Sequence, residues 1–207
     1  MKLNGVDIVD RKGLSEWKKL LYQWVKLTDK YCLEFEGNDA PYYYNERANI
    51  SVLSGAAWTI GWLSLEEFQH QKKAKKKRSG RADLYVSSVE QEYYIEAKFK
   101  SASLQSSKGI SEIAKETIAL AIPDSRATRR GADGGTAVAL AFIPVYLPVS
   151  QEEKLEECIS KAVKEMLGAG FHALAWTFPL QMRNPKKDDK YISPGVFLAA
   201  ANEKHWK

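Results

Sequence analysis

The chain has 207 residues, of which 44% are hydrophobic and 28% charged, as expected for one soluble globular domain with a buried core. No segment approaches the ~20 consecutive apolar residues of a membrane-spanning helix, and the N-terminus lacks the apolar stretch of a signal peptide. Cys32 and Cys158 form neither a disulfide framework nor a zinc-binding spacing. We therefore expect a cytoplasmic protein with no membrane partner, and the net charge of +5 leans weakly toward polyanionic partners.

Two helices are predicted in the first third of the chain. Apolar residues recur at helical spacing over residues 14–31, and a second, more apolar helix is predicted over residues 43–63. On this second helix, Glu46 lies one turn before Ile50, on the stripe expected to face the core. An unpaired buried charge is costly, so Glu46 either finds a partner or stays in the first turn, where a carboxylate stabilises the positive end of the helix dipole.

The segment over residues 66–81 is dense in charge, and Ser79-Gly80 breaks any helix there. A run of like charges is most often a solvated face or an exposed loop, and a localisation signal is another reading. Because the run precedes the strands described next, it is also placed to hold the phosphates of a polyanion. The predicted nucleic-acid-binding residues of this segment are Lys72, Lys73, Lys75, Lys76, Lys77, Arg78 and Arg81.

Residues 80–100 are predicted to form a β-hairpin with a polar turn over residues 87–92. Side chains alternate faces along a strand, so Glu96 and Lys98 share one face of the second strand. With an even number of residues in the turn, we expect Asp83 opposite Lys98 and diagonal to Glu96, at Cβ separations of ~5 Å and ~7 Å. Two carboxylates and an amine then converge on one patch.

Such a patch has the chemistry of a magnesium site. Mg²⁺ takes oxygen ligands, usually one or two carboxylates plus waters and substrate phosphate. It polarises a phosphoryl oxygen and activates bound water, while a nearby lysine can orient that water or balance charge on the phosphate. The alternative is a solvated strand face whose cross-strand ion pairs contribute roughly a few tenths of a kcal/mol each.

The sequence Gly-Arg-Ala-Asp-Leu-Tyr-Val at residues 80–86, followed by Tyr-Ile-Glu-Ala-Lys at residues 94–98, resembles the PD-(D/E)xK nuclease superfamily, with Ala in place of the proline. The resemblance covers about residues 42–147 and implies a restriction-endonuclease-like fold. It implies that Asp83, Glu96 and the Ala97 carbonyl bind Mg²⁺ or Mn²⁺ and that Lys98 is the catalytic lysine. Glu46 matches the place from which a preceding helix often adds a carboxylate, so it joins the catalytic and metal-binding candidates.

The rest of the chain is predicted to complete one α/β domain with a central mixed sheet flanked by helices. A helix over residues 110–122 ends at Pro123, and a loop over residues 125–136 follows. Residues 136–148 read as a strand buried on both faces, residues 151–167 as a helix, and residues 171–179 and 196–201 as strands. We expect a single domain over residues 1–207, with a helical extension at 1–41, a core at 42–147 and completion of the sheet by 148–207. The loop adds Arg126, Arg129 and Arg130 as candidate contacts to a nucleic-acid backbone.

These patterns favour a Mg²⁺-dependent nuclease that hydrolyses phosphodiester bonds of DNA. One alternative is a non-cleaving nucleic-acid-binding or regulatory protein of the same fold. Another is a basic adaptor that binds RNA or an acidic protein through the lysine run. Dependence of activity on a divalent metal separates the first hypothesis from the other two. Because cutting both strands of a duplex often uses two sites, a homodimer stays open.

Overall fold

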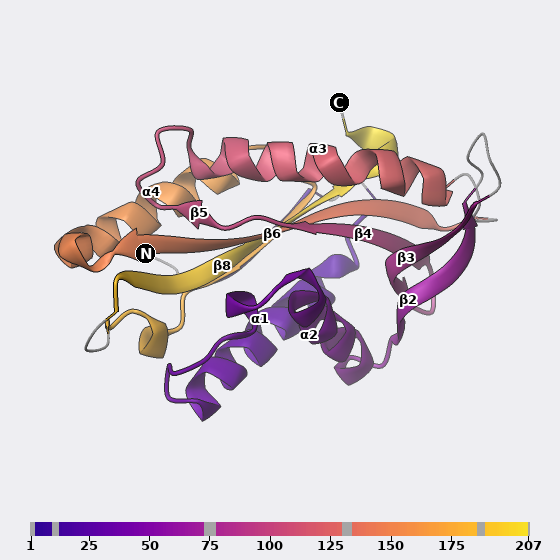
Figure 1. Cartoon of the computed structure of the whole chain (residues 1–207). Helices are drawn as coiled ribbons and strands as arrows, with labels where there is room; N and C mark the ends of the chain where they lie inside the picture. The colour runs from indigo at the N-terminus through magenta and orange to yellow at the C-terminus, as the bar shows by residue number, and fades with distance from the viewer. Residues whose placement is uncertain (1–2, 10–12, 73–77, 130–133, 186–188, 207) are drawn as a thin grey trace.

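The computed structural model of the chain describes residues 3–9, 13–72, 78–129, 134–185 and 189–206. One mixed sheet forms its middle layer, and helices cover both faces (Figure 1). The helices are α1 (Trp17–Glu34), α2 (Glu46–Thr59), α3 (Ile110–Arg129) and α4 (Leu155–Leu167). The strands are β1 (Asn4–Ile8), β2 (Leu63–Lys72), β3 (Arg78–Ser87), β4 (Glu92–Phe99), β5 (Ala102–Ser103), β6 (Thr136–Pro148), β7 (Ala173–Thr177) and β8 (Tyr191–Asn202).

The eight strands make one sheet in the order β1-β7-β8-β6-β4-β3-β2, and β5 pairs with the far end of β6. The β4–β6 and β5–β6 pairs are parallel, whereas all the other pairs are antiparallel. Helices α1 and α2 lie on one face of the sheet, and α3 and α4 lie on the other (Figure 1). The predicted α/β class with a central mixed sheet is therefore confirmed.

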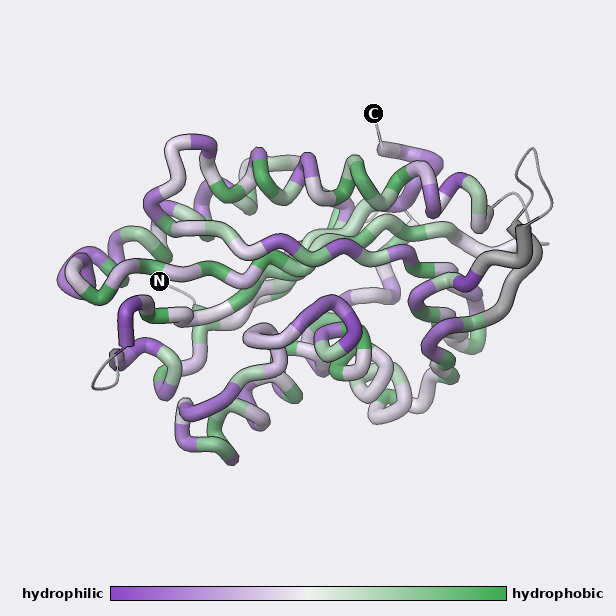
Figure 2. The backbone as a smooth tube through the Cα atoms, viewed as in Figure 1, coloured by the Kyte–Doolittle hydropathy of each residue, from purple (hydrophilic) through white to green (hydrophobic). Residues whose placement is uncertain are grey.

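Strand β6 contributes side chains to two hydrophobic cores, one on each face of the sheet. Its side chains alternate between the faces: Val138, Leu140 and Phe142 pack toward α1 and α2, and Ala139 and its alternate neighbours pack toward α3 and α4. All of these residues are fully buried, and Figure 2 shows hydrophobic residues gathered along the central strands. A strand covered on both faces needs apolar residues at every position, so the uninterrupted apolar run correctly predicts this buried strand.

Most predicted elements are found within a few residues of their expected bounds. The helix predicted over residues 14–31 is α1, the helix over 43–63 is the shorter α2, and the helix over 151–167 is α4. The strands predicted over residues 171–179 and 196–201 are β7 and the longer β8. These elements carry strong local patterns, and their ends depend on contacts that a pattern does not contain.

Two edge strands were not predicted. Strand β1 lies in the segment expected to be a helical extension and pairs with β7, far along the chain. Strand β2 overlaps the charge-dense segment 66–81, expected to be a solvated face or a loop, and pairs with β3. In β2 the usual pattern is inverted, because Leu63 and Leu65 are more than half exposed while Ser64 is buried beside Ser54 of α2. An edge strand has few neighbours, so its sequence need not alternate toward a core.

The prediction that Pro123 ends a helix is wrong. Helix α3 continues through Pro123 to Arg129, so the expected loop begins later. Proline inside a helix removes one hydrogen bond to the carbonyl four residues earlier. Here that carbonyl belongs to Ala119, an exposed residue, and Pro123 is itself exposed, so water can take the place of the missing donor. The extra turn brings α3 residues 124–129 over the end of β4.

Candidate functional site

The β3–β4 hairpin fixes the register of the predicted site. Its turn is tight: the Ser88 amide donates to the Gln91 carbonyl, and the Ser88 hydroxyl accepts from the amides of Glu90 and Gln91. The ladder runs from the Ser87–Glu92 pair to the Leu84–Ile95 pair. This register sets Asp83 across from Glu96, with Lys98 two residues further along β4. The expectation that Asp83 lies opposite Lys98 is therefore wrong by two residues, although all three side chains still share one face.

The two strands separate at Asp83. Beyond the Leu84–Ile95 pair the backbone ladder stops, and the Asp83 Oδ2 atom accepts a hydrogen bond of 2.8 Å from the backbone amide of Ala97. A side-chain oxygen thus takes the place of a strand carbonyl. The carboxylate of Asp83 is held at the opening between β3 and β4, and it is half-buried.

Glu96 is held from the opposite side by helix α3. Glu96 is only 3% exposed, and its Oε1 atom accepts a hydrogen bond of 2.6 Å from the Thr128 hydroxyl. Thr128 is fully buried. Sequence reasoning missed Thr128 because it ended the helix at Pro123. The signal was present, since Ile118, Ser125 and Thr128 continue the buried helical stripe past the proline.

Lys98 lies on the same face of β4 and extends over the backbone. Its Nζ atom donates to the Ala97 carbonyl at 2.9 Å and lies 3.9 Å from the Oδ2 atom of Asp124 on α3. Asp124 and Thr128 are one helical turn apart, so one side of α3 reaches both functional positions of β4. The Ala97 carbonyl, a predicted metal ligand, already accepts one donor, and a carbonyl oxygen has two lone pairs.

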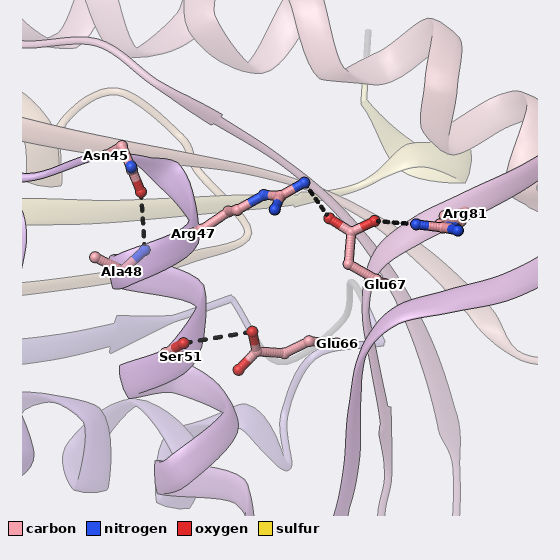
Figure 3. A network of polar contacts seen from close by, with 7 residues as sticks. All are labelled: Asn45, Arg47, Ala48, Ser51, Glu66, Glu67 and Arg81. Carbon is pink, nitrogen blue, oxygen red and sulfur yellow. Dashed lines mark hydrogen bonds and ion pairs between the residues drawn. The ribbon is translucent and has the colours of Figure 1, made fainter.

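Glu46 begins helix α2, after the N-cap Asn45, whose Oδ1 atom accepts from the Ala48 amide (Figure 3). Burial raises the pKa of Glu46; the charge of Lys98 lowers it, and the carboxylates of Asp83 and Glu96 raise it again. Glu46 therefore lies within electrostatic reach of the other three predicted site residues, although it comes from a helix on the opposite face of the sheet.

The donor atoms at this site suit a hard cation. Asp83 and Glu96 supply carboxylates and Ala97 a carbonyl, and Mg²⁺ prefers such oxygen ligands to the nitrogen and sulfur ligands that zinc favours. Among the residues that the structure describes, no group of three or more histidine, cysteine, aspartate or glutamate side chains is gathered closely enough to hold a metal ion by itself. Mg²⁺ commonly completes its shell with water and substrate phosphate, so the residues present fit that ion.

The predicted nucleic-acid-binding residues fall into four groups. Arg81 is exposed on β3, two residues before Asp83. Arg126 lies in α3 rather than in a loop, and its Nε atom donates to the buried Glu203 at 2.8 Å. Lys72, Arg78 and Arg129 lie at the ends of β2, β3 and α3. Lys73, Lys75, Lys76, Lys77 and Arg130 lie outside the described residues.

A polar network beside the site was not predicted. Arg47, the residue after Glu46, pairs with Glu67 of β2 at 2.9 Å, and Glu67 also pairs with Arg81 at 3.5 Å (Figure 3). The neighbouring Glu66 accepts a hydrogen bond of 3.3 Å from the Ser51 hydroxyl of α2. Sequence reasoning missed this network because it merged the two glutamates with the lysine run. The signal was a pair of acidic residues placed ahead of an otherwise basic stretch.

Comparison with protein-family models, with curated proteins and with solved structures finds no match for this chain. Within the described part of the chain, no helix has both the length and the apolar character needed to cross a membrane. Function is therefore inferred from the residues of the site and from their geometry.

Proposed function

We propose that this protein is a Mg²⁺-dependent nuclease of the PD-(D/E)xK type that hydrolyses phosphodiester bonds of DNA. The observation that supports this proposal most is the opening between β3 and β4, where Asp83, Glu96 and Lys98 lie on one face and the charge of Glu46 acts with theirs. Gathering acidic side chains that repel one another costs free energy, and a bound cation would offset this cost, so such a cluster favours a metal-binding role.

Asp83, Glu96 and the Ala97 carbonyl would hold the metal ion, with Glu46 as a further carboxylate. When bound, Mg²⁺ polarises a phosphoryl oxygen and makes a coordinated water a better nucleophile. The protein orients the ligand atoms in advance. The Ala97 amide fixes one oxygen of Asp83, and the Thr128 hydroxyl fixes one oxygen of Glu96. Such supporting hydrogen bonds hold ligands in a productive geometry.

Lys98 would act on the water and the phosphate. Its ammonium group has three N–H donors, and one of them goes to the Ala97 carbonyl. A further donor can orient the attacking water or stabilise the negative charge that develops on the phosphoryl oxygens. Asp124, at 3.9 Å from the Lys98 Nζ atom, would bias the ammonium toward the α3 side of the opening.

Two further features suit the proposed substrate and compartment. The net charge is +5, and Arg81 is 58% exposed next to the site, which favours a polyanion such as DNA. Cys32 and Cys158 are both free cysteines, which suits the reducing cytoplasm.

The test is incubation of the purified protein with plasmid and linear DNA, with EDTA, Mg²⁺, Mn²⁺ or Ca²⁺. We expect cleavage with Mg²⁺ or Mn²⁺, and little turnover with Ca²⁺, which holds its ligands at longer distances. Asp83→Asn, Glu96→Gln and Lys98→Met should each abolish cleavage. Glu92→Gln is the matched control, because it makes the same chemical change as Glu96→Gln on the same strand but outside the site, where Glu92 accepts from two tyrosine hydroxyls.

The outcomes separate the hypotheses. Cleavage by wild type and Glu92→Gln but not by Glu96→Gln supports a nuclease and excludes a contaminating enzyme. DNA binding without cleavage under any metal would favour the non-cleaving nucleic-acid-binding or regulatory protein. If all variants match wild type in every assay, the proposed site has no catalytic role.

A further inference from the structure

Strand β2 is interrupted at Glu67. The β2–β3 ladder pairs Glu66 with Leu84 and then Phe68 with Ala82, so Glu67 falls across from Asp83 without joining the ladder. The φ angle of Glu67 is 52°, a left-handed conformation that residues other than glycine rarely adopt. A strained backbone at one position of a strand persists only where the surroundings enforce it, and such positions cluster at functional sites. The interruption sends the Glu67 side chain toward the start of α2.

The Glu67 carboxylate lies between two guanidinium groups. Its Oε1 atom is 2.9 Å from Arg47 Nη2, and its Oε2 atom is 3.5 Å from Arg81 Nη1, so each oxygen meets a different arginine (Figure 3). The side chains are 77% exposed for Arg47, 58% for Arg81 and 40% for Glu67. The three formal charges sum to +1. Exposed ion pairs of this kind are weak, so another oxyanion can replace the carboxylate at low cost.

This network lies directly beside the proposed active site. Arg47 follows Glu46 in the first turn of α2, and Arg81 precedes Asp83 by two residues on β3, which puts Arg81 and Asp83 on one face of the strand. Guanidinium groups bind phosphate and carboxylate oxygens by the same donor geometry. A nucleic acid whose scissile phosphate lies at Asp83 could therefore place a neighbouring phosphate at the two arginines.

We propose that Arg47 and Arg81 form a binding site for a backbone phosphate of nucleic acid next to the scissile one, and that Glu67 occupies this site while no nucleic acid is bound. That the ligand is a nucleic acid rests on the proposed function. The competing explanation is that Glu67 merely fastens α2 to the β2–β3 pair. The Ser51 hydroxyl donates to Glu66 and also joins α2 to β2, so a Glu66 variant is the matched control for a purely structural role.

The experiment measures fluorescence anisotropy of a short labelled DNA duplex with EDTA, over a series of KCl concentrations. Arg47→Gln and Arg81→Gln should each weaken binding roughly two- to fivefold and flatten the slope of log affinity against log salt by about 0.9. Glu67→Gln should tighten binding by a similar factor, because the competing carboxylate is lost. Glu66→Gln removes the same charge one residue away and should change affinity much less. Lys161→Gln, at an exposed position of α4, controls for the loss of one positive charge.

Several results would overturn the phosphate site. It is wrong if Arg47→Gln binds with the affinity and salt slope of Lys161→Gln. It is also wrong if Glu67→Gln binds no more tightly than Glu66→Gln, since Glu67 would then not compete with the ligand. If Glu67→Gln fails to fold, the comparison of Arg47→Gln with Lys161→Gln still tests the phosphate site, because a side chain as exposed as that of Arg47 is not needed for folding.

Failure of this site and failure of the nuclease proposal give different results. If the protein cleaves DNA while the arginine variants bind like wild type, the nuclease proposal stands and the phosphate site does not. If the arginine and Glu67 variants behave as expected but no metal supports cleavage, the phosphate site stands and the nuclease proposal falls. Absence of DNA binding by wild type at every salt concentration would overturn the phosphate site.

Discussion

The hydrogen bond from Thr128 to Glu96 links the stability of the fold to the geometry of the proposed site. Replacing Thr128 by Val keeps the side-chain shape but removes the hydroxyl that donates to Glu96 Oε1 at 2.6 Å. Hydrogen bonds to a charged group contribute about 1.5–3 kcal/mol, and both side chains here are buried, so solvent screens the loss little. For a chain of this length, such a loss lowers the melting temperature by roughly 3–12 °C.

Urea unfolding at neutral pH measures this effect directly. Thr117→Val is the matched control, because Thr117 is also buried on α3 but donates to the Ile113 carbonyl of its own helix, a neutral bond worth about 0.5–1.5 kcal/mol. Combining Thr128→Val with Glu96→Gln in a double-mutant cycle should give a coupling energy above ~0.5 kcal/mol. Thr128→Val should also slow DNA cleavage, whereas Thr117→Val should not. Equal effects of the two valine variants on both stability and cleavage would refute the positioning role of Thr128.

Two further predictions concern the site helix and the sheet. Burial is the largest cause of the raised pKa of Glu46 in the folded protein. The contribution of Glu46 to folding stability is therefore fully present below the ordinary pKa of a carboxyl group, and it is lost as the pH rises through the pKa of the folded state. At neutral pH, Glu46→Gln should thus leave the metal-free protein as stable as wild type or more stable, and the difference in stability between the two should disappear on acidification. A loss of stability in thermal melts at neutral pH would instead indicate that Glu46 stabilises the helix dipole. For Gly195→Ala, the new Cβ would lie 2.1 Å from the Thr177 carbonyl oxygen, so thermal melts should show a loss of about 1–3 kcal/mol. Gly55→Ala in α2 meets nothing closer than 3.9 Å and should instead gain about 0.4–1 kcal/mol, and equal melts for the two alanine variants would contradict this packing.

The sequence alone was sufficient for the parts of the fold that have strong local patterns. Strand β6 is apolar throughout because it is buried on both faces, and α1 repeats its apolar residues every three to four positions because one side faces the sheet. The β3–β4 hairpin alternates around a short polar turn. The same local reading put Asp83, Glu96 and Lys98 on one face, because side chains alternate along a strand and the turn holds an even number of residues, so an error of two residues in the register leaves the shared face unchanged.

The tertiary structure decided everything that depends on partners distant in the sequence. Strands β1 and β2 lie at the edges of the sheet, where few neighbours constrain their side chains, so they carry no recognisable pattern. Helix α3 passes through Pro123 at a point where both Ala119 and Pro123 are exposed, and only this extra turn brings Thr128 to Glu96. Glu46 of α2 acts electrostatically with the site residues of β3 and β4, and Glu67 of β2 pairs with Arg81 of β3 beside the site. A sequence pattern records which face a side chain prefers, whereas the meeting of two side chains depends on how whole elements pack.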